Sequence, residues 1–280
     1  MVSALSPLLP LVDGRSIPQL GLGVYKTTDA ESADAVDVAL RHGYRLIDTA
    51  AMYLNEQGVG AGMRRSGLPR EEVFVTTKVW HTDNGYDSTL RSFDESLERL
   101  GTDYVDLYMI HWPAPARDRY VDTWRAFETL AADGRARSIG VANFHPKHIE
   151  RLLAETVTVP AVNQVELHPW LPQAEVRAFD ARHGIVTQAW SPLARGHVFD
   201  AAHGGEVLAG IGQKHGKTAA QVVIRWHLQL GNAVIPKSVT PSRIVENIDV
   251  FDFELDAEDV ALIAGLETGE RTGVDPDDRN

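Results

Sequence analysis

Three ionisable side chains close three successive apolar segments of the sequence. Asp48 ends the run RLID, Lys78 follows VFVTT, and His111 follows VDLYMI. Lys78 lies 30 residues after Asp48, and His111 lies 33 residues after Lys78. These spacings are typical of one strand with its helix. A tyrosine, Tyr53, follows Asp48 by five residues. If the segments are parallel strands of one barrel, their carboxyl ends bring these side chains to one rim.

Together the four side chains have the chemistry of a proton donor for an oxygen that is being reduced. A carboxylate at Asp48 would keep a buried Lys78 protonated. The lysine charge would lower the pKa of the Tyr53 phenol, which is about 10 in water, and make it a general acid. A neutral His111 would orient a carbonyl by donating a hydrogen bond. The set contains no nucleophile, so a complete enzyme also needs a hydride donor.

Each of these residues alone has an ordinary structural explanation. The aspartate could cap a turn, the lysine could reach solvent, and the histidine could be a core residue with its hydrogen bonds made. Their occurrence at the ends of three successive segments favours a site over three coincidences.

A candidate site for the hydride donor lies near the C-terminus, in AVIPKSVTPSRIVENIDVF (233–251). This segment predicts a strand, a loop and then a helix. Lys237, Ser238, Thr240 and Arg243 surround the helix start, where free N–H groups and the helix dipole favour anions. Arg243 suits a phosphate monoester, which favours NADPH over NADH. On these residues alone, a basic helix start that simply faces solvent is the alternative.

The elements that would position these groups are short runs rich in β-branched residues, separated by amphipathic stretches. Strands alternating with helices predict an α/β fold with a parallel sheet. Eight such runs predict a (β/α)8 TIM barrel as a single domain, residues 1–280, with a short N-terminal β-hairpin cap and a C-terminal extra helix and tail. A doubly wound sheet is the alternative. The runs are 19–25, 45–50, 73–79, 105–112, 137–143, 161–167, 185–193 and 232–237.

Local signals agree with this arrangement. Thr28 stands three residues before Glu31, the spacing of a capping box. Gly43 and Gly101 stand where helices are expected to end. The stretch Gly21-Leu22-Gly23 lacks the third glycine of a dinucleotide fingerprint and does not support a Rossmann fold.

The composition predicts an ordinary globular protein. With 44% hydrophobic residues the chain can bury a large core, and its net charge of −12 argues against binding to nucleic acid or an anionic membrane. The absence of cysteine excludes disulfides and thiolate chemistry and fits a reducing cytosol. The N-terminal MVSALSPLLPL lacks a basic leader, and no run reaches the roughly 18 apolar residues of a membrane span. We therefore expect a cytoplasmic protein, and a monomer without an obligate protein partner.

Several motifs, in order, resemble the aldo-keto reductase family. GYRLIDTAAMYLNEQGVG (43–60) resembles its aspartate–tyrosine motif, and IPKSVTPSRIVEN (235–247) resembles its cofactor motif. TTKVW, LYMIHWP, GVANF, NQVELHP and QAWSPLARG fall between them in the family's order, from about Asp13 to Asp275 overall. The resemblance implies a barrel that reduces small carbonyl compounds with NADPH (NADP+). Trp190 and the short tail resemble the prokaryotic branch of 2,5-diketo-D-gluconic acid reductases.

The resemblance also implies roles for individual residues. The tetrad would be Asp48, Tyr53, Lys78 and His111, with Tyr53 as proton donor, Lys78 and Asp48 tuning it, and His111 orienting the carbonyl. Positions that match substrate-pocket residues are Tyr25, Trp80, His111 and Trp112. Positions that match cofactor-binding residues are Gly23, Val24, Tyr25 and Asp48, then Asn143 and Gln164 at the nicotinamide amide, Trp190 stacked on the nicotinamide ring, Ser191 and Leu193 at the pyrophosphate, and Lys237, Ser238, Val239, Thr240, Arg243, Glu246 and Asn247 at the adenosine 2′-phosphate and adenine.

Two departures from the family pattern and one short loop bear on specificity. Ala142 stands where the family often has serine, which removes one hydroxyl that could bind the amide. Trp190 stands where many relatives have tyrosine. The aromatic pocket predicts aldehydes and α-dicarbonyls with some apolar body, with keto-sugars as a further option. The short segment 113–120 predicts an open pocket, and the sequence does not fix the substrate.

Three other functions compete with this interpretation. Relatives that reduce steroid carbon–carbon double bonds commonly have glutamate at the histidine position, so His111 favours carbonyl reduction. A cofactor-binding regulatory subunit with slow turnover would use the same barrel, but the tetrad is complete. A metal-dependent hydrolase could use His145, His148 and His168, yet no metal-ligand pattern is predicted, and His145 with His148 predicts a solvated helix start. The acidic last residues, 271–280, are expected to be loosely held.

Overall fold

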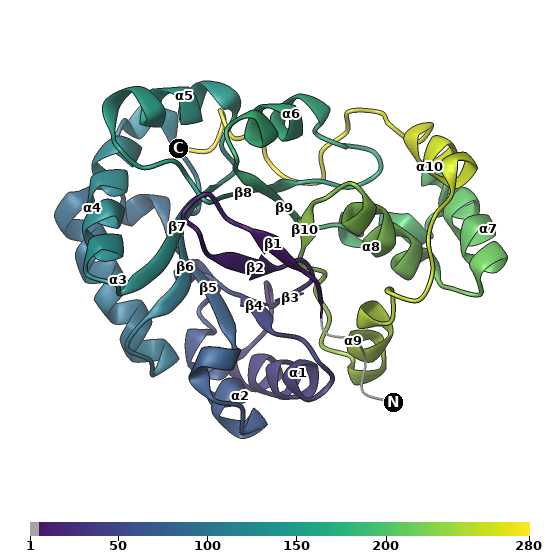
Figure 1. The fold of residues 1–280 in the computed structure, drawn as a ribbon, viewed down its shortest axis with the longest axis horizontal. Helices are drawn as coiled ribbons and strands as arrows, with labels where there is room; N and C mark the ends of the chain where they lie inside the picture. The colour runs from purple at the N-terminus through teal and green to yellow at the C-terminus, as the bar shows by residue number, and fades with distance from the viewer. Residues whose placement is uncertain (1–5) are drawn as a thin grey trace.

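The computed structural model describes residues 6–280, so the first five residues of the apolar N-terminal run lie outside it. Eight parallel strands form one sheet in the order β3 to β10. Isolated bridges from Leu20 to Val234 and from Gly23 to Lys237 connect the first strand to the last and close the predicted barrel (Figure 1). The strands are β3 (Leu22–Gly23), β4 (Leu46–Asp48), β5 (Phe74–Val79), β6 (Val105–Ile110), β7 (Ala136–Ala142), β8 (Val162–Glu166), β9 (Val186–Trp190) and β10 (Ala233–Val234).

Each of the eight predicted runs contains one of these strands, but the two at the closure are much shorter than expected. β3 and β10 have two residues each. Pro236 follows β10 and has no N–H to donate, so the ladder ends there and closure continues through single hydrogen bonds. One of these is donated by the Gly23 N–H to the Pro236 carbonyl at 3.2 Å.

Helices surround the sheet, as the sequence pattern predicts (Figure 1). Thr28 caps the first helix in a complete capping box with Glu31, and Gly101 ends the third with φ of 67°. Within the described range, none of the helices is long and apolar enough to cross a membrane. They are α1 (Asp29–Arg41), α2 (Glu56–Ser66), α3 (Tyr86–Leu100), α4 (Tyr120–Ala132), α5 (Pro146–Glu155), α6 (Ala174–Arg182), α7 (Gly205–His215), α8 (Ala219–Gln229), α9 (Pro241–Ile248) and α10 (Ala257–Ala264).

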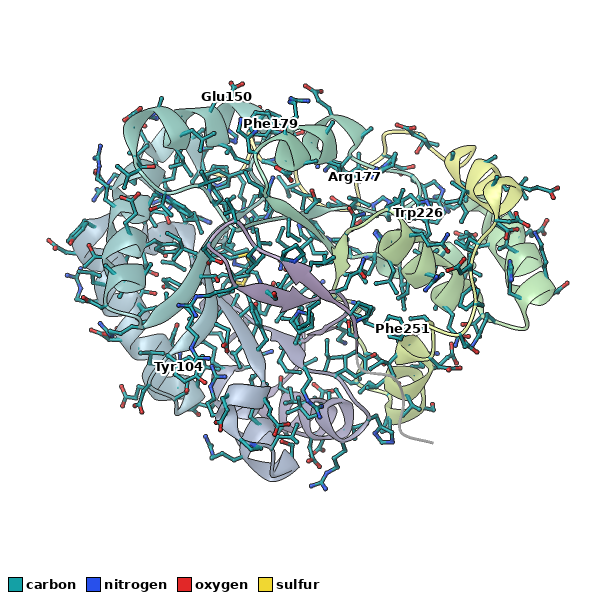
Figure 2. The ribbon with its side chains drawn as sticks, viewed as in Figure 1. Tyr104, Glu150, Arg177, Phe179, Trp226 and Phe251 are labelled. Atoms are coloured by element: carbon teal, nitrogen blue, oxygen red, sulfur yellow. The ribbon has the colours of Figure 1, made fainter. Side chains whose placement is uncertain are left out.

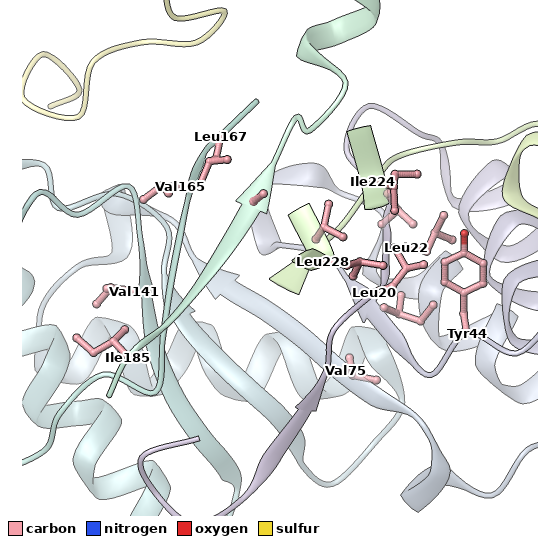
Figure 3. Packing of buried hydrophobic residues seen from close by; sticks show 14 of the residues in the cluster. Leu20, Leu22, Tyr44, Val75, Val141, Val165, Leu167, Ile185, Ile224 and Leu228 are labelled. Atoms are coloured by element: carbon pink, nitrogen blue, oxygen red, sulfur yellow. The ribbon is translucent and has the colours of Figure 1, made fainter. Parts of the chain in front are cut away.

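The main apolar core fills the space between sheet and helices. Figure 3 shows Leu20, Leu22 and Ile224 packed near Tyr44, whose hydroxyl donates to the Ile244 carbonyl at 2.9 Å. Gly21 lies in the same strand region, and a Cβ there would come within 2.4 Å of the Leu46 side chain. The glycine pair that resembled a dinucleotide fingerprint is therefore explained, at Gly21, by close packing within the barrel.

The N-terminal hairpin closes one end of the barrel. β1 (Leu8–Pro10) and β2 (Ser16–Pro18) pair antiparallel, which confirms the predicted cap, and Figure 1 shows them lying across the ring of strands. Ile17 and Leu11 pack with Leu46, Leu107 and Met109 of the sheet in a second apolar cluster. The beginnings of the strands are therefore sealed by hydrocarbon.

On the outer surface, arginine side chains pack against an aromatic ring (Figure 2). Tyr104, labelled there, lies between the guanidinium carbons of Arg70 and Arg137, at 4.1 and 3.7 Å from the ring centroid. The last residues run from α10 back across the barrel and end beside α5 (Figure 1).

Candidate active site

The carboxyl ends of β4 and β5 bring Asp48 and Lys78 into direct contact. The lysine Nζ donates to Asp48 Oδ1 at 2.6 Å and to the Thr49 carbonyl at 2.9 Å. Gln164 donates from Nε2 to the second carboxylate oxygen at 2.7 Å. Burial pulls the pKa of Lys78 down and that of Asp48 up, and each partner opposes the shift of the other. The pair is buried and its polar atoms are satisfied, the condition under which a buried ion pair persists.

Tyr53 lies against this pair because of a short, strained connection. The 3-10 turn Ala51–Tyr53 follows β4, and Leu54 ends it with φ of 59°, in the left-handed region. The Lys78 Nζ is 5.2 Å from the phenol ring centroid, and the His111 ring is 5.5 Å from it. The structure therefore brings Tyr53 together with the three residues that the sequence placed at strand ends.

One expectation about this group is wrong: the pKa of Tyr53 is raised, not lowered. Burial raises the Tyr53 pKa well above its ordinary value, and the nearby Asp48 and Tyr25 raise it further. The charge of Lys78 does not reverse this shift, because it is paired with Asp48 at 2.6 Å. Without substrate, the phenol holds its proton firmly.

His111 is held as a neutral ring. Burial lowers its pKa well below the usual value, and the positive charge of Lys78 lowers it further, with smaller effects from His81 and Arg279. Its Nδ1 is buried without a hydrogen-bond partner in the described structure. Because buried N–H groups are rarely left without an acceptor, the ring proton belongs on Nε2. Nε2–H is then the hydrogen-bond donor that this ring can offer.

The three predicted pocket aromatics surround the histidine and the phenol. The Trp80 ring is 5.1 Å from His111 in an edge-on arrangement, and the Trp112 ring lies 6.5 Å from it. Tyr25 is 4.9 Å from Tyr53 and is 42% exposed. Aromatic rings therefore surround the two polar groups, His111 and Tyr53, an arrangement that suits a carbonyl compound with a flat or apolar body.

A second set of predicted residues lies on the adjoining strand ends. Trp190 donates from Nε1 to Asn143 Oδ1 at 2.8 Å, and Asn143 Nδ2 donates to the His111 carbonyl at 2.9 Å. Both Asn143 and Ser191 have positive φ, at 63° and 48°. Gln164 Oε1 accepts no hydrogen bond within residues 6–280, so it is available to a ligand amide. Asn143 thus links the indole of Trp190 to the backbone of the histidine.

The loop between β10 and α9 carries the predicted anion-binding residues. Lys237 and Arg243 are exposed and form no ion pair within the described part of the chain. The Ser238 hydroxyl accepts from the Thr240 N–H at 3.1 Å and shapes the turn before the helix. Two unpaired cations on a chain of net charge −12, at the start of a helix, fit a phosphorylated nucleotide. Of the other predicted cofactor residues, Gly23 ends β3, Glu246 and Asn247 lie in α9, and Val24, Leu193 and Val239 lie in loops.

The two histidines at the start of α5 differ from the prediction. Pro146 begins the helix after His145, as expected, but His148 is 3% exposed and therefore not solvated. Its Nδ1 accepts from the His145 N–H at 3.1 Å, and its Nε2 lies 3.2 Å from Asp277 Oδ1 without a hydrogen bond to it in the described structure. The lone pair of Nδ1 is already used by a backbone N–H, so that nitrogen cannot bind a metal.

Comparison with known proteins agrees with this geometry. Residues 19–268 match the profile described as the Aldo/keto reductase family. The chain belongs to this family. An aldo-keto reductase of Mycolicibacterium smegmatis is 56% identical over 272 residues, 97% of this chain and 98% of that one. The glyoxal reductase of Bacillus subtilis is 50% identical over 279 residues, 99% of each chain. A solved variant of Gox0644 in complex with NADPH is 46% identical, covers 99% of this chain and 100% of that one, and superposes with a TM-score of 0.93.

Two site residues of this aldo-keto reductase were missed by the sequence analysis. Gln188 accepts from Gln164 Nε2 at 2.7 Å, and its own Nε2 is buried with no partner among the described residues. Alternating residues of β9 predict that Gln188 faces the same side as Trp190, so this signal was available. Arg279, at the far end of the chain, lies over the pocket aromatics. No local pattern places it there.

Proposed function

We propose that the protein reduces aldehydes and ketones to alcohols with NADPH. The observation that carries this proposal is the buried Lys78–Asp48 pair, with a phenol and a neutral imidazole beside it at one end of the barrel. The exposed cations Lys237 and Arg243 fit the phosphates of the dinucleotide. The Oε1 of Gln164 can accept a hydrogen bond from the dinucleotide's amide. When bound, NADPH supplies the hydride; the chain supplies the proton and the alignment.

The proton comes from Tyr53. His111 Nε2–H donates a hydrogen bond to the carbonyl oxygen and holds it near the phenol. The raised pKa of Tyr53 keeps its proton in place until the substrate oxygen becomes strongly basic. As the proton leaves, the phenolate is stabilised by Lys78, which Asp48 keeps charged. Stabilising the phenolate lowers the cost of giving up the proton, so the pair limits how far burial raises the Tyr53 pKa.

The remaining residues hold the dinucleotide and shape the pocket. Trp190 offers a flat, half-buried indole for the nicotinamide ring, and its hydrogen bond to Asn143 fixes the indole plane. Arg243 and Lys237 would contact the 2′-phosphate. Tyr25, Trp80 and Trp112 favour α-dicarbonyls and aromatic aldehydes, and the name of the glyoxal reductase from Bacillus subtilis supports that substrate class.

Loss of NADPH absorbance in the presence of a carbonyl compound tests the proposal directly. We expect purified protein to oxidise NADPH with methylglyoxal, phenylglyoxal and 4-nitrobenzaldehyde, and to use NADH less well. The Tyr53→Phe variant is the control for non-enzymatic oxidation. A protein that binds NADPH, as followed by tryptophan quenching, but turns over none of these substrates would contradict the enzymatic proposal and favour a regulatory role.

A further inference from the structure

We propose that Arg279 makes the substrate pocket selective for carbonyl compounds that carry a carboxylate. This inference rests on the proposed reductase function and specifies its substrate class. Its occupant is an aldehyde or ketone with the carboxylate at the end remote from the reducible carbonyl.

The position of the guanidinium carries the argument. Its carbon lies 5.1 Å from the Trp80 ring centroid and 5.7 Å from that of Trp112. Trp80 in turn contacts His111, with ring centroids 5.1 Å apart. The cation therefore lies within about 10 Å of the group that would orient the carbonyl, a separation that the body of a small aromatic acid spans.

Arg279 has hydrogen-bonding capacity to spare. It forms no ion pair with any of residues 6–280, and its Nε is buried without a hydrogen-bond partner. An arginine offers five N–H donors in a planar fork that matches a carboxylate. Stacking on two indoles satisfies its flat faces but none of these donors, so its edge is available to an anion.

The chain holds this arginine in place through a first attachment near Trp190. The buried Glu166 carboxylate accepts from the Thr272 N–H at 2.6 Å, from its hydroxyl at 2.5 Å and from the Gly273 N–H at 3.1 Å. Gly273 packs so closely that a Cβ there would lie 2.6 Å from the Trp190 ring. The expectation of a loosely held tail is therefore not met at this point.

A second attachment fixes the last residues to α5 and to the loop after β6. Asp277 pairs with Lys147 at 2.6 Å and lies 3.2 Å from His148, and Asp275 lies 3.3 Å from His145. Beyond the arginine, the side chain of Asn280 accepts from a backbone N–H of the 115–117 turn at 2.8 Å. Arg279 lies between these contacts, so its approach to the tryptophans is built into the fold.

The surrounding charges also favour an anion. Burial lowers the pKa of His81, which is next to Trp80. The positive charges of Arg117 and Arg279 lower it further, and the negative charge of Asp83 opposes them. Asp118, the next acid along that loop, is paired with Arg151. On a chain of net charge −12, the positive charge of Arg279 beside the two tryptophans concentrates anionic ligands there.

The test compares two substrates that differ only in charge, 4-formylbenzoate and its methyl ester. For Arg279→Gln we expect the KM for the acid to rise at least about 10-fold, the loss of one charged hydrogen-bonding partner, while kcat and both constants for the ester stay within about 2-fold. Arg279→Lys should fall between. Arg271→Gln removes the same charge from the same tail, where Arg271 pairs with Asp275, and should leave the acid KM nearly unchanged.

Each other outcome has a defined meaning. Equal losses for acid and ester would show that Arg279 only packs the tail, and unchanged constants would show that it meets no substrate; either overturns the inference. If the wild type reduces methylglyoxal but neither of these compounds, the inference fails and the proposed function stands; if it reduces none of them, the proposed function fails. In that case, tryptophan quenching by 4-(hydroxymethyl)benzoate, compared between wild type and Arg279→Gln, still measures carboxylate binding without turnover.

Discussion

The two ends of the barrel differ in which residues have positive φ, and therefore in how much backbone strain they contain. In the loops that lead from a helix into a strand, at the hairpin end, residues with positive φ are glycines. Every non-glycine residue with positive φ in the described chain lies instead in a loop that follows a strand, at the other end. The glycines are 43, 67, 101, 134, 184 and 231, and the non-glycine residues are Lys26, Leu54, Ala114, Asp118, Asn143, Gln173, Ser191, Ala194 and Arg195.

Burial of charge follows the same division. The hairpin end is closed by Leu11, Ile17 and Met109, whereas the other end buries the Asp48–Lys78 pair. Left-handed non-glycine residues cost about 1–3 kcal/mol each, and buried charges cost several more. Strained backbone and the buried ion pair therefore lie where the strands end and substrate would bind, and apolar packing closes the opposite end.

Of the variants that compare the two ends, Tyr53→Phe at the catalytic end is expected to have the largest effect. Removing the hydroxyl leaves no proton for the alkoxide, so kcat should fall by about 1,000-fold or more, the upper part of general-acid contributions. Stability and NADPH affinity should change little, because the ring stays against Lys78 and Tyr25. Steady-state kinetics, urea unfolding and tryptophan quenching measure the three quantities.

The matched control for this variant is Tyr25→Phe, which removes a hydroxyl from the neighbouring ring, 4.9 Å away. It should keep most of the activity. If Tyr53→Phe lost NADPH binding as severely as turnover, Tyr53 would be a structural residue and the catalytic end would lose its proton donor.

The next largest effect is expected at the hairpin end, from Ile17→Ala. Ile17 is completely buried between hairpin and sheet, so truncation should lower the free energy of unfolding by about 3 kcal/mol. The KM and kcat of the remaining folded protein should not change, because the cavity forms far from His111. Leu8→Ala on the same hairpin is the control, since Leu8 is 64% exposed and should cost little. A loss of kcat in folded Ile17→Ala would show that the two ends are coupled.

The sequence predicted the parts of the site that follow from local pattern. Asp48, Lys78 and His111 stand at strand ends, and strand ends are readable from alternation and spacing. The positions of Arg279 and the burial of His148 depend on contacts between the tail and α5, about 130 residues apart in the chain. The predicted direction of the Tyr53 pKa shift was wrong because burial of the phenol dominates it, ahead of Asp48 and Tyr25, and residue order does not show how deeply the ring is buried. The ends of β3 and β10 were overestimated because closure of the barrel, not propensity, sets their length.

Two buried acids depart from the division between the ends: Asp106, near the start of β6, is paired with Arg70 at 2.8 Å, whereas Asp180 has no such partner within residues 6–280. Asp180, in the last turn of α6, is fully buried near the beginnings of β8 and β9. Thr187 donates to it at 2.8 Å and Asn163 Nδ2 at 3.3 Å, and none of the cations in the described part of the chain pairs with it. Burial raises the pKa of Asp180 to about 7, only partly opposed by these hydrogen bonds.

Stability should therefore fall as the pH rises at this site. The folded pKa lies above the unfolded value of 3.8, so the folded state binds the proton more tightly. The contribution is complete below the unfolded pKa and is lost as pH rises through about 7. Between pH 5 and 7 the loss is about 2 kcal/mol.

The Asp180→Asn variant should remove this loss of stability. The amide keeps the shape of the side chain, and its Nδ2 can donate to Asn163 Oδ1, which is buried without a partner in the described structure. Urea unfolding of both proteins at several pH values gives the difference directly, and taking the difference cancels the opposite contributions of His148 and His227, whose pKa values burial lowers to about 4 and about 3. Parallel curves for the two proteins would mean that Asp180 is ionised in the folded state at pH 5, and that the hairpin end also stabilises a buried charge.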